Sequence, residues 1–256
     1  MILSFEGKRV EPSQATISVT SEAVTFGRGV FETFLAVEQK VFLLDRHLIR
    51  FLGTLQAVGL KVPPERDLRT WLSALLGDAG PGDFRVKLLG LPEGVYLFAF
   101  PWREPAPEGW RLFIHQGNRG LAAYKTTSYL EPLLALEAAQ AKGGDEALLV
   151  NHHGAIYEGS RTNFYWVQNG KVYSKKRAVL PGIIRDFLSQ EAPGGLKWGN
   201  LSVEELPGIE GAFVTNALRG LVEVIQINSE AVPQSPLSQE WKSWLEQKRF
   251  DLAQKP

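Results

Sequence analysis

The chain has 256 residues, of which 44% are hydrophobic and 22% charged, a balance typical of folded globular proteins rather than disordered or fibrous ones. Lysine plus arginine equals aspartate plus glutamate, at 28 each, so no overall positive field is available to hold a nucleic acid or an anionic membrane. Cysteine is absent, which excludes disulfides, thiolate nucleophiles and thiolate metal sites. No apolar run approaches the roughly 20 residues of a membrane helix. We therefore expect a cytoplasmic protein with a small-molecule partner.

The first part of the chain predicts a sheet with helices. The elements expected there are strands at 2–5 and 17–19, two β-rich runs between 24 and 44 that are broken by Gly27 and Gly29 and joined near Glu38-Gln39, a helix from 45 to 58, a helix from 63 to 76, and strands at 85–89, 94–100 and 111–115. Asp45 is expected to cap the first helix and Gly59 to end it. Arg50 falls on the face of that helix opposite its apolar positions, together with His47 and Thr54.

The second part predicts a helix, two hairpins and a helical tail. Its expected elements are a helix from 130 to 141, hairpin strands at 146–151 and 155–160, a second hairpin at 163–167 and 171–174, a helix from 183 to 188, a strand at 211–216 and a helical tail from 236. Asn169-Gly170 in the second hairpin is a strong type I′ turn signal. We expect two domains, residues 1–117 and 118–256, with the boundary near residue 118.

Lys125 is the first candidate for chemistry. It stands in the run Ala122-Ala123-Tyr124-Lys125-Thr126-Thr127, whose apolar residues would partly desolvate its amine. Desolvation lowers the pKa of a lysine and makes the amine available for imine formation. An ordinary surface lysine is the alternative interpretation.

Three further features could serve a phosphorylated pyridine cofactor. Glu158 could pair with a protonated ring nitrogen, and Arg50 could hold a phosphate through two parallel hydrogen bonds. The segment Pro181-Gly182-Ile183-Ile184 opens a helix, whose free backbone N–H groups bind phosphate. Each feature alone also fits a bland role: a solvated hairpin glutamate, a solvated helix arginine and an ordinary helix start.

The combination of these features resembles a known family. The strings are F-G-R-G-V-F-E-T at 26–33, D-R-H-L-I-R at 45–50, Y-K-T-T-S-Y-L at 124–130, D-E-A-L-L-V-N-H-H-G-A-I-Y-E-G-S-R-T-N-F at 145–164, and L-P-G-I-I-R at 180–185. In this order they resemble the class IV aminotransferases, over roughly residues 1–228. The resemblance implies an α/β (α+β) protein of fold-type IV, like D-amino acid aminotransferase. It also implies a smaller N-terminal domain, and a larger C-terminal domain with a barrel-like sheet that carries the lysine.

The resemblance also implies roles for individual residues. Lys125 would form the Schiff base with pyridoxal 5′-phosphate and move protons, and Glu158 would pair with the pyridine nitrogen. Arg50 and the backbone of Ile183 and Ile184 would hold the phosphate. Tyr129 would lie near the phenolic oxygen of the cofactor. Family members are usually homodimers, so a homodimer is expected.

Three activities share this scaffold: branched-chain transamination, D-amino acid transamination, and the lyase reaction that converts 4-amino-4-deoxychorismate to 4-aminobenzoate and pyruvate. Asn216 and Ala217, in the string Thr215-Asn216-Ala217-Leu218, look like the lyase form, where branched-chain enzymes commonly carry Gly-Thr to contact phosphate and carboxylate. The short chain also favours the lyase. A catalytically silent binding protein is a third hypothesis, against which the joint presence of Lys125, Glu158 and Arg50 argues.

The substrate side is less well determined. Phe31 is expected to line it, and Thr33 should project to the same side because side chains alternate along a strand. Many relatives carry Arg-Gly where this chain has Leu89-Gly90, so a frequent carboxylate-binding arginine is missing. Arg85, Arg28 or Arg119 could replace its charge, although each also fits a surface role.

His152 and His153 are adjacent, and side chains of adjacent residues are expected to diverge. No further ligand stands at metal-binding spacing near them, so we interpret both as turn residues and expect no metal site.

Overall fold

The computed structural model describes residues 1–105, 107–117 and 120–256, and its two sheets divide the chain into two compact units. Unit 1 comprises Met1–Glu104, Tyr124–Ser128 and Arg249–Pro256, and unit 2 comprises Pro105–Ala123 and Tyr129–Lys248. The boundary expected near residue 118 falls outside the described residues. The segment that carries Lys125 groups with unit 1, although the sequence suggested the C-terminal domain.

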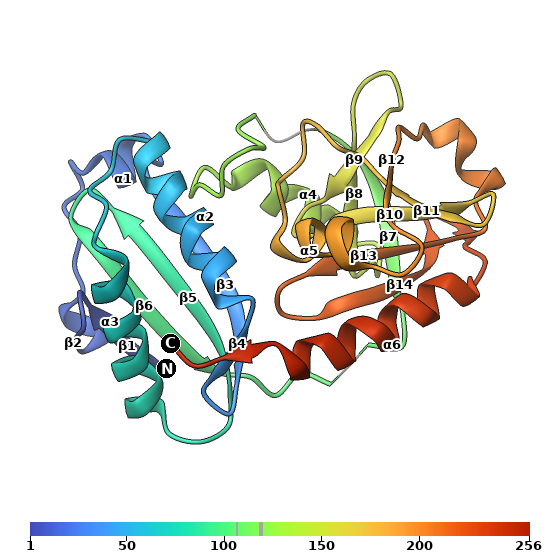
Figure 1. Ribbon diagram of the computed structural model, residues 1–256. Helices are drawn as coiled ribbons and strands as arrows, with labels where there is room; N and C mark the ends of the chain where they lie inside the picture. Colours follow the sequence, from blue (N-terminus) through green and yellow to red (C-terminus); the bar gives the residue numbers. More distant parts are fainter. Residues whose placement is uncertain (106, 118–119) are drawn as a thin grey trace. The chain divides into compact units, whose positions relative to one another are not determined.

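Unit 1 is a seven-stranded sheet with helices on one face (Figure 1). Its strands follow the order β16-β4-β3-β5-β6-β1-β2. Its elements are β1 (Ile2–Phe5), β2 (Lys8–Arg9), the 3-10 turn η1 (Pro12–Gln14), α1 (Glu22–Thr25), β3 (Val30–Val37), β4 (Lys40–Phe42), α2 (Leu44–Ala57), α3 (Glu65–Ala79), β5 (Asp83–Leu91), β6 (Gly94–Pro101) and β16 (Ala253–Gln254).

Alternation along β3 and β5 separates the two faces of this sheet. Every second residue of β3, from Val30 to Ala36, is buried, and the residues between them are half-buried. The buried set packs beneath the apolar residues of α2, which include Leu48, Phe51 and Leu55. The half-buried set, with Phe31 and Thr33, lies on the other face, as expected from the period of a strand.

One predicted strand of unit 1 is wrong, and one begins later than predicted. The two β-rich runs joined near Glu38-Gln39 are confirmed as β3 and β4, which pair antiparallel. Residues 17–19 form no strand, because the Ser18 hydroxyl accepts the backbone N–H of Thr20 over 3.2 Å and makes a local turn. Val24, the expected start of the first β-rich run, lies instead in the short helix α1, since Ser21 caps that helix by accepting the N–H of Ala23 over 3.1 Å.

The start of α2 also differs from the prediction. Its N-cap is Leu43, in the left-handed conformation at φ 55°, with no side-chain cap. Asp45 lies within the first turn instead, where an anion is favoured by the helix dipole, and its carboxylate binds Arg69 of α3. Asp45 therefore joins two helices rather than capping one.

Unit 2 is built on a nine-stranded mixed sheet in the order β12-β11-β10-β13-β14-β7-β8-β9, with β15 paired to β14 (Figure 1). Its elements are β7 (Trp110–Gln116), α4 (Leu130–Gln140), β8 (Glu146–Val150), β9 (Ile156–Gly159), β10 (Asn163–Gln168), β11 (Lys171–Ser174), α5 (Ile183–Glu191), β12 (Lys197–Trp198), the 3-10 helix η2 (Val203–Gly208), β13 (Gly211–Asn216), β14 (Gly220–Ile227) and β15 (Glu230–Ala231). The last helix, α6 (Pro236–Asp251), begins in unit 2 and ends in unit 1.

The two edges of the unit 2 sheet meet, which makes it barrel-like. Ile156, at the start of the edge strand β9, donates its N–H to the carbonyl of Leu201 over 2.9 Å, just beyond the other edge strand β12. Ala155 and Ser202 form an isolated bridge at the same place. Closure of a sheet in this way buries the side chains of its inner face.

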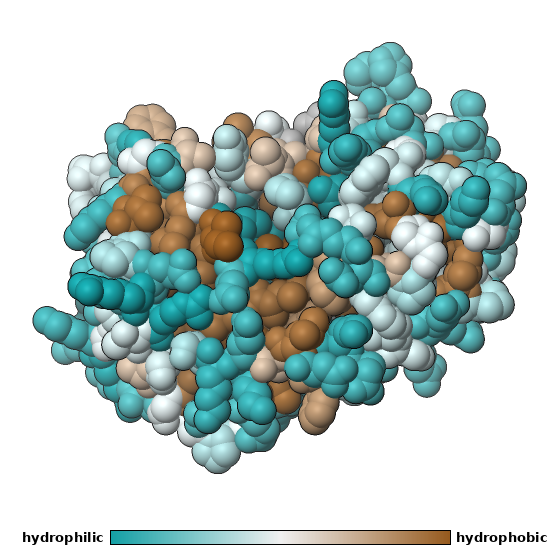
Figure 2. All heavy atoms as spheres, viewed as in Figure 1, coloured by the Kyte–Doolittle hydropathy of each residue, from teal (hydrophilic) through white to brown (hydrophobic). Residues whose placement is uncertain are grey.

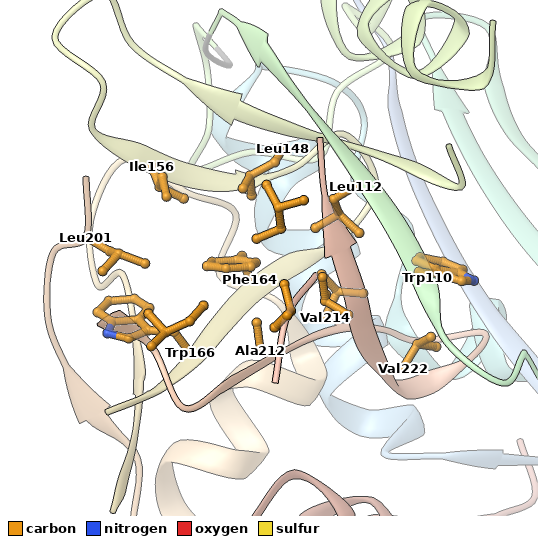
Figure 3. Close-up of a cluster of buried hydrophobic side chains, with 14 of the residues drawn as sticks. Trp110, Leu112, Leu148, Ile156, Phe164, Trp166, Leu201, Ala212, Val214 and Val222 are labelled. Atoms are coloured by element: carbon orange, nitrogen blue, oxygen red, sulfur yellow. The ribbon is translucent and has the colours of Figure 1, made fainter. Parts of the chain in front are cut away.

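The core of unit 2 fills that inner face (Figure 3). It combines residues from strands far apart in sequence, among them Leu112, Leu148, Phe164 and Val214, and two tryptophans, Trp110 and Trp166. Parallel pairing of β7 with both β8 and β14 brings these strands together. The predicted hairpin turn is confirmed, because Asn169 and Gly170 have φ values of 50° and 62°.

The outer surface is mixed in character. On the face drawn in Figure 2, hydrophilic side chains surround separate apolar patches. Within the described residues, no helix is both long enough and apolar enough to span a membrane.

Candidate functional site

Lys125 is held by backbone pairing with the start of β3. Phe31 donates its N–H to the Lys125 carbonyl over 2.9 Å, and Thr127 donates its N–H to the carbonyl of Gly29 over 2.9 Å. The Thr127 hydroxyl adds a hydrogen bond of 2.8 Å to the carbonyl of Gly27. The backbone around the lysine is thus hydrogen-bonded to the segment that leads into β3.

The amine of Lys125 lies on the face of the unit 1 sheet opposite the helices. Its Nζ is 4.5 Å from the centre of the Phe31 ring. Phe31 and Thr33 both belong to the half-buried set of β3, so the structure places these predicted site residues and the lysine on the same side. The Phe31 ring therefore bounds the amine on one side.

Two cations of β5 share this face. Arg85 and Lys87 are half-buried residues of β5, and Lys87 stands opposite Thr33 in the antiparallel pairing. The Arg85 guanidinium lies 4.7 Å from the ring centre of Phe100, and Lys87 Nζ lies 5.3 Å from that of Phe31. Burial lowers the pKa of Lys87, and the charge of Arg85 lowers it further. Sequence reasoning found Arg85 but missed Lys87.

Arg50 is paired with a buried carboxylate on the helix side of the sheet. Glu32 of β3 accepts hydrogen bonds from Arg50 Nε over 2.8 Å and from Nη2 over 2.6 Å. His47 Nδ1 lies 3.1 Å from the same carboxylate. The expected outward face of α2 is therefore wrong, because His47 and Thr54 are both buried. Glu32 supplies the polar partner of His47, and the Thr54 hydroxyl donates to the Arg50 carbonyl over 2.7 Å.

Glu158 is buried near the end of β9, and its orientation is fixed from two sides. Its Oε2 accepts a hydrogen bond of 3.2 Å from the Asn163 amide and one of 2.9 Å from the N–H of Leu180. Asn163 also donates to the Leu180 carbonyl over 2.9 Å. A buried carboxylate held in one orientation suits pairing with a ring nitrogen of a pyridine cofactor.

The Pro-Gly string has a steric explanation. A Cβ atom at Gly182 would lie 1.9 Å from Asn163 Oδ1, so only glycine fits beside the amide that orients Glu158. Gly182 is also the N-cap of α5, which makes Ile183 and Ile184 its first two residues. Their N–H groups belong to the first turn, which has no partners within the helix and therefore favours a phosphate.

A second buried carboxylate, Glu146 of β8, organises the loop that follows Glu158. Its oxygens accept the Ser160 hydroxyl, the Ser160 N–H over 3.1 Å, the Arg161 N–H over 3.2 Å and the Thr162 hydroxyl over 3.3 Å. Burial raises the pKa of Glu146, whereas Arg161 and the hydrogen bonds oppose that rise. Sequence reasoning missed this residue, since it stood in an apolar strand pattern.

Tyr129 is tied to the same loop. Its hydroxyl donates a hydrogen bond to the Ser160 carbonyl, and the Ser160 hydroxyl donates to Glu146. The phenol is half-buried at the N-cap of α4. Glu146, Ser160 and Tyr129 form one chain of hydrogen bonds in unit 2.

Asn216 ends β13, and Ala217 begins the turn to β14. Asn216 Oδ1 accepts the N–H groups of Leu218 over 3.1 Å and of Arg219 over 2.9 Å. This side-chain mimic of a turn leaves the strand ends close together. Thr215, just before the turn, shares a hydrogen bond of 3.1 Å with the buried Tyr165 hydroxyl.

The other arginines considered from the sequence do not join these groups. Arg28 donates to the carbonyl of Val58 from Nε and Nη2, over 3.1 and 3.0 Å, and pairs with Glu22. Arg28 therefore fastens the segment before β3 to the end of α2. Arg119 lies outside the described residues.

The two adjacent histidines lie in a turn, as expected. Asn151 Oδ1 accepts the N–H groups of His153 and Ala155, over 3.0 and 2.9 Å. The expected divergence of their side chains is wrong, because the ring centres of His152 and His153 are 3.8 Å apart. Among the residues that the structure describes, no three His, Asp or Glu side chains are arranged to hold a metal ion.

Comparison with known proteins identifies the family of this chain. The family model described as amino-transferase class IV matches residues 29–227, well over half of the chain. The chain belongs to the class IV aminotransferases. This membership confirms the predicted family, the enzyme class and the cofactor, pyridoxal 5′-phosphate.

Similar proteins carry several names. The branched-chain-amino-acid aminotransferase of Pseudomonas aeruginosa is 22% identical over 90% of this class IV aminotransferase and 86% of the relative. The aminodeoxychorismate lyase of Bacillus subtilis is 25% identical over 88% and 86% of the two chains. A solved branched-chain aminotransferase of Thermoproteus uzoniensis has a TM-score of 0.88 at 23% identity, covering 99% and 98%. At that identity the structural likeness shows the fold, and it confirms the predicted fold-type IV architecture.

Proposed function

We propose that this class IV aminotransferase is a lyase that converts 4-amino-4-deoxychorismate to 4-aminobenzoate and pyruvate. The observation that carries the proposal is the pair of cations, Arg85 and Lys87, on the sheet face that also holds Phe31 and Lys125. Both products are carboxylates, so the substrate carries two negative groups. A branched-chain amino acid carries one, and its apolar side chain would leave a half-buried cation without a counter-charge. The 2-oxoglutarate that a transaminase can also bind carries two carboxylates, so the turnover test below decides between the two reactions.

In the proposed reaction, Lys125 would transfer the protons. Pyridoxal phosphate, when bound, withdraws electrons from the substrate carbon that bears the amino group and makes its hydrogen acidic. The Lys125 amine would take that proton and deliver one to the departing enolpyruvyl group, whose ether C–O bond breaks as the ring becomes aromatic. Phe31 would keep the amine on the reacting side.

The remaining residues would hold rather than react. Glu158 would keep the ring nitrogen protonated, which strengthens the electron withdrawal. Arg50, and the N–H groups of Ile183 and Ile184, would bind phosphate, and Tyr129 would contact the phenolic oxygen. Asn216 and Ala217 would present backbone groups to cofactor or substrate, and Thr33 would line the substrate face.

The runner-up is transamination of D-amino or branched-chain amino acids, which the names of several relatives favour. The two reactions differ in what they consume. We expect purified protein with aminodeoxychorismate to release 4-aminobenzoate and pyruvate when no 2-oxo acid is added, and Lys125→Ala to release neither product. Repeated turnovers with an amino acid and 2-oxoglutarate or pyruvate, and no 4-aminobenzoate, would establish the runner-up instead.

The absorbance of the purified protein distinguishes the proposed enzyme from a catalytically silent binding protein. The proposal requires a yellow absorbance that shifts on borohydride treatment, because the reagent reduces the Schiff base to Lys125. A colourless protein that gains no absorbance on addition of pyridoxal phosphate would leave only the binding role.

We also propose that the protein is a homodimer. Val19 and Phe26, before β3 in unit 1, are 79% and 78% exposed, and Leu130 of α4 in unit 2 is 67% exposed. Large apolar side chains in such number mark surfaces that another chain covers. Light scattering coupled to size exclusion should give twice the 28.4 kDa chain mass, and Phe26→Asp should lower it if the segment is part of the interface.

A further inference from the structure

Unit 2 contains a basic hollow that the proposed reaction does not use. It has a volume of about 390 Å³ and is lined by Tyr157, Lys175, Lys176, Arg177, Ala178, Trp198, Gly199 and Asn200. Three of these eight residues are cationic, none is acidic, and two carry aromatic rings. Tyr157 precedes Glu158 on β9, and side chains alternate along a strand, so the hollow lies on the other face of β9 from that carboxylate.

Lys175, one of the cations that line the hollow, is held in place by its neighbours. Lys175 Nζ donates to Asn200 Oδ1 over 2.9 Å and lies 4.5 Å from the centre of the Tyr157 ring. Burial lowers the pKa of Lys175, so its amine has already lost part of its hydration in the absence of any ligand. An anion that binds there meets a partly desolvated charge, and electrostatic attraction is stronger for such a charge than for a fully hydrated one.

A buried arginine fixes the loop that carries the three cations. Arg185 of α5 is 7% exposed, and its Nη1 donates to the carbonyls of Lys175 over 2.5 Å and Lys176 over 3.4 Å. The loop then turns at Ala178, whose φ of 59° is left-handed. The backbone of the cationic run is therefore ordered by contacts from a helix, which reduces the entropy lost when a ligand binds.

The indole of Trp198 lies near two positive groups. The Arg185 guanidinium is 5.4 Å from its ring centre, and Lys176 Nζ is 5.9 Å from it. Trp198 is 39% exposed, so part of the ring remains open to solvent. Cations near an aromatic ring hold its orientation, and an open indole face can stack on a planar heterocycle.

We propose that this hollow binds a nucleoside diphosphate, with the base stacked on Trp198 and the phosphates bound by Lys175, Lys176 and Arg177. Three cations without an acidic neighbour exceed the charge of a single carboxylate and match that of a diphosphate. Arginine binds phosphate oxygens through paired hydrogen bonds, and lysine binds them as a compact charge. The volume falls within the range of small-molecule pockets.

Calorimetric titration of the cofactor-loaded protein with ADP, pyrophosphate and adenosine tests the proposal. We expect saturable binding of ADP at one site per chain, and at least tenfold weaker binding of both pyrophosphate and adenosine. The affinity for ADP should fall as salt is raised, because the phosphates are held by charges. No saturable heat with ADP would overturn the proposal, as would pyrophosphate binding as tightly as ADP.

Matched variants separate the hollow from general surface charge. Lys176→Gln with Arg177→Gln should weaken ADP binding at least tenfold, and Trp198→Leu should abolish the preference for ADP over pyrophosphate. Lys171→Gln with Lys197→Gln removes two exposed lysines from β11 and β12 that do not line the hollow. If this control weakens ADP binding as much as the first pair does, the site is not the hollow. Failure of this test leaves the proposed lyase reaction untouched, because no residue is shared.

Discussion

The carboxylate of Glu32 holds Arg50 through two hydrogen bonds, donated by Nε over 2.8 Å and by Nη2 over 2.6 Å. Glu32 is completely buried, and His47 adds a third contact of 3.1 Å. Burial raises the pKa of Glu32, but the charge of Arg50 and the bonds from His47 and Arg50 outweigh it and hold the pKa well below its usual range. Glu32, which lies on β3 beneath α2, therefore fixes the orientation of the Arg50 guanidinium.

Removing the charge of Glu32 should destabilise the protein. Glu32→Gln leaves the guanidinium of Arg50 with a neutral partner, and breaking a buried ion pair from one side costs about 3–5 kcal/mol in the free energy of unfolding. Urea denaturation of the two proteins measures the difference. The exposed pair Arg66–Asp67 supplies the control, because Arg66→Gln should cost less than about 1 kcal/mol. Equal losses in the two variants would show that Glu32 is not a buried partner.

The pH dependence of stability should report His47. Burial lowers its pKa below the ordinary 6.5, with Arg50 and Lys125 acting in the same direction and Glu32 opposing. Below pH 6.5 the unfolded chain binds a proton at this residue that the folded chain does not, so the free energy of unfolding falls as the pH drops from 6.5 toward the folded pKa.

His47→Gln should reduce that fall by up to about 1.4 kcal/mol per pH unit, which is the maximum for one group. Chemical denaturation at pH 7.5, 6.5 and 5.5 gives the slope. His153→Gln removes an exposed histidine and should leave the slope unchanged. A wild-type slope that survives in His47→Gln would mean that His47 is protonated in the folded protein.

Much of the local structure of this site could be predicted from the sequence. The alternation that puts Phe31 and Thr33 on one face of β3, and the turn at Asn169-Gly170, depend on residues adjacent in the chain. The helix that starts after Gly182 is local as well. The order and spacing of the motifs that contain Arg50, Lys125 and Glu158 then indicated the family. The family model matches residues 29–227, which include all three.

The errors and omissions involve distant partners. Arg50 was expected on an outward face because its partner, Glu32, lies on a strand 18 positions earlier, and helical period alone does not show what packs beneath a polar stripe. Lys87 is a candidate substrate-binding residue only because the register of β3 and β5 places it opposite Thr33, 54 positions away in the sequence. Register across strands follows from the whole sheet, and no local pattern specifies it.

The Glu146 carboxylate should control how well the loop after Glu158 is formed. Glu146→Gln replaces an acceptor of four loop donors by an amide whose NH₂ group faces other donors, so we expect a loss of about 3 kcal/mol in the free energy of unfolding. We also expect weaker cofactor binding in protein that remains folded, because Ser160 and Tyr129 lose their support. Absorbance titration with pyridoxal phosphate measures the affinity.

Two controls separate positioning from simple destabilisation. Glu137→Gln changes an exposed glutamate of α4 and should alter neither quantity. Tyr129→Phe should reproduce the weaker cofactor binding with little loss of stability, since the phenol is only half-buried. Unchanged cofactor affinity in folded Glu146→Gln would restrict Glu146 to a structural role.

Lys87 should determine the preference for a substrate with two carboxylates. Lys87→Met keeps the length of the side chain and removes a charge from the face that holds Arg85 and Phe31. A charge-assisted hydrogen bond contributes about 1.5–3 kcal/mol, so we expect KM for aminodeoxychorismate to rise roughly 10- to 100-fold. The interaction is made equally with bound substrate and with the transition state, so kcat should change little. Lys40→Met, an exposed lysine of β4 in the same sheet, should leave both constants unchanged. A fall in kcat at constant KM would instead assign Lys87 to the chemical step. No change in either constant would show that Lys87 does not contact the substrate, and Arg85 would then be the residue that binds the carboxylate.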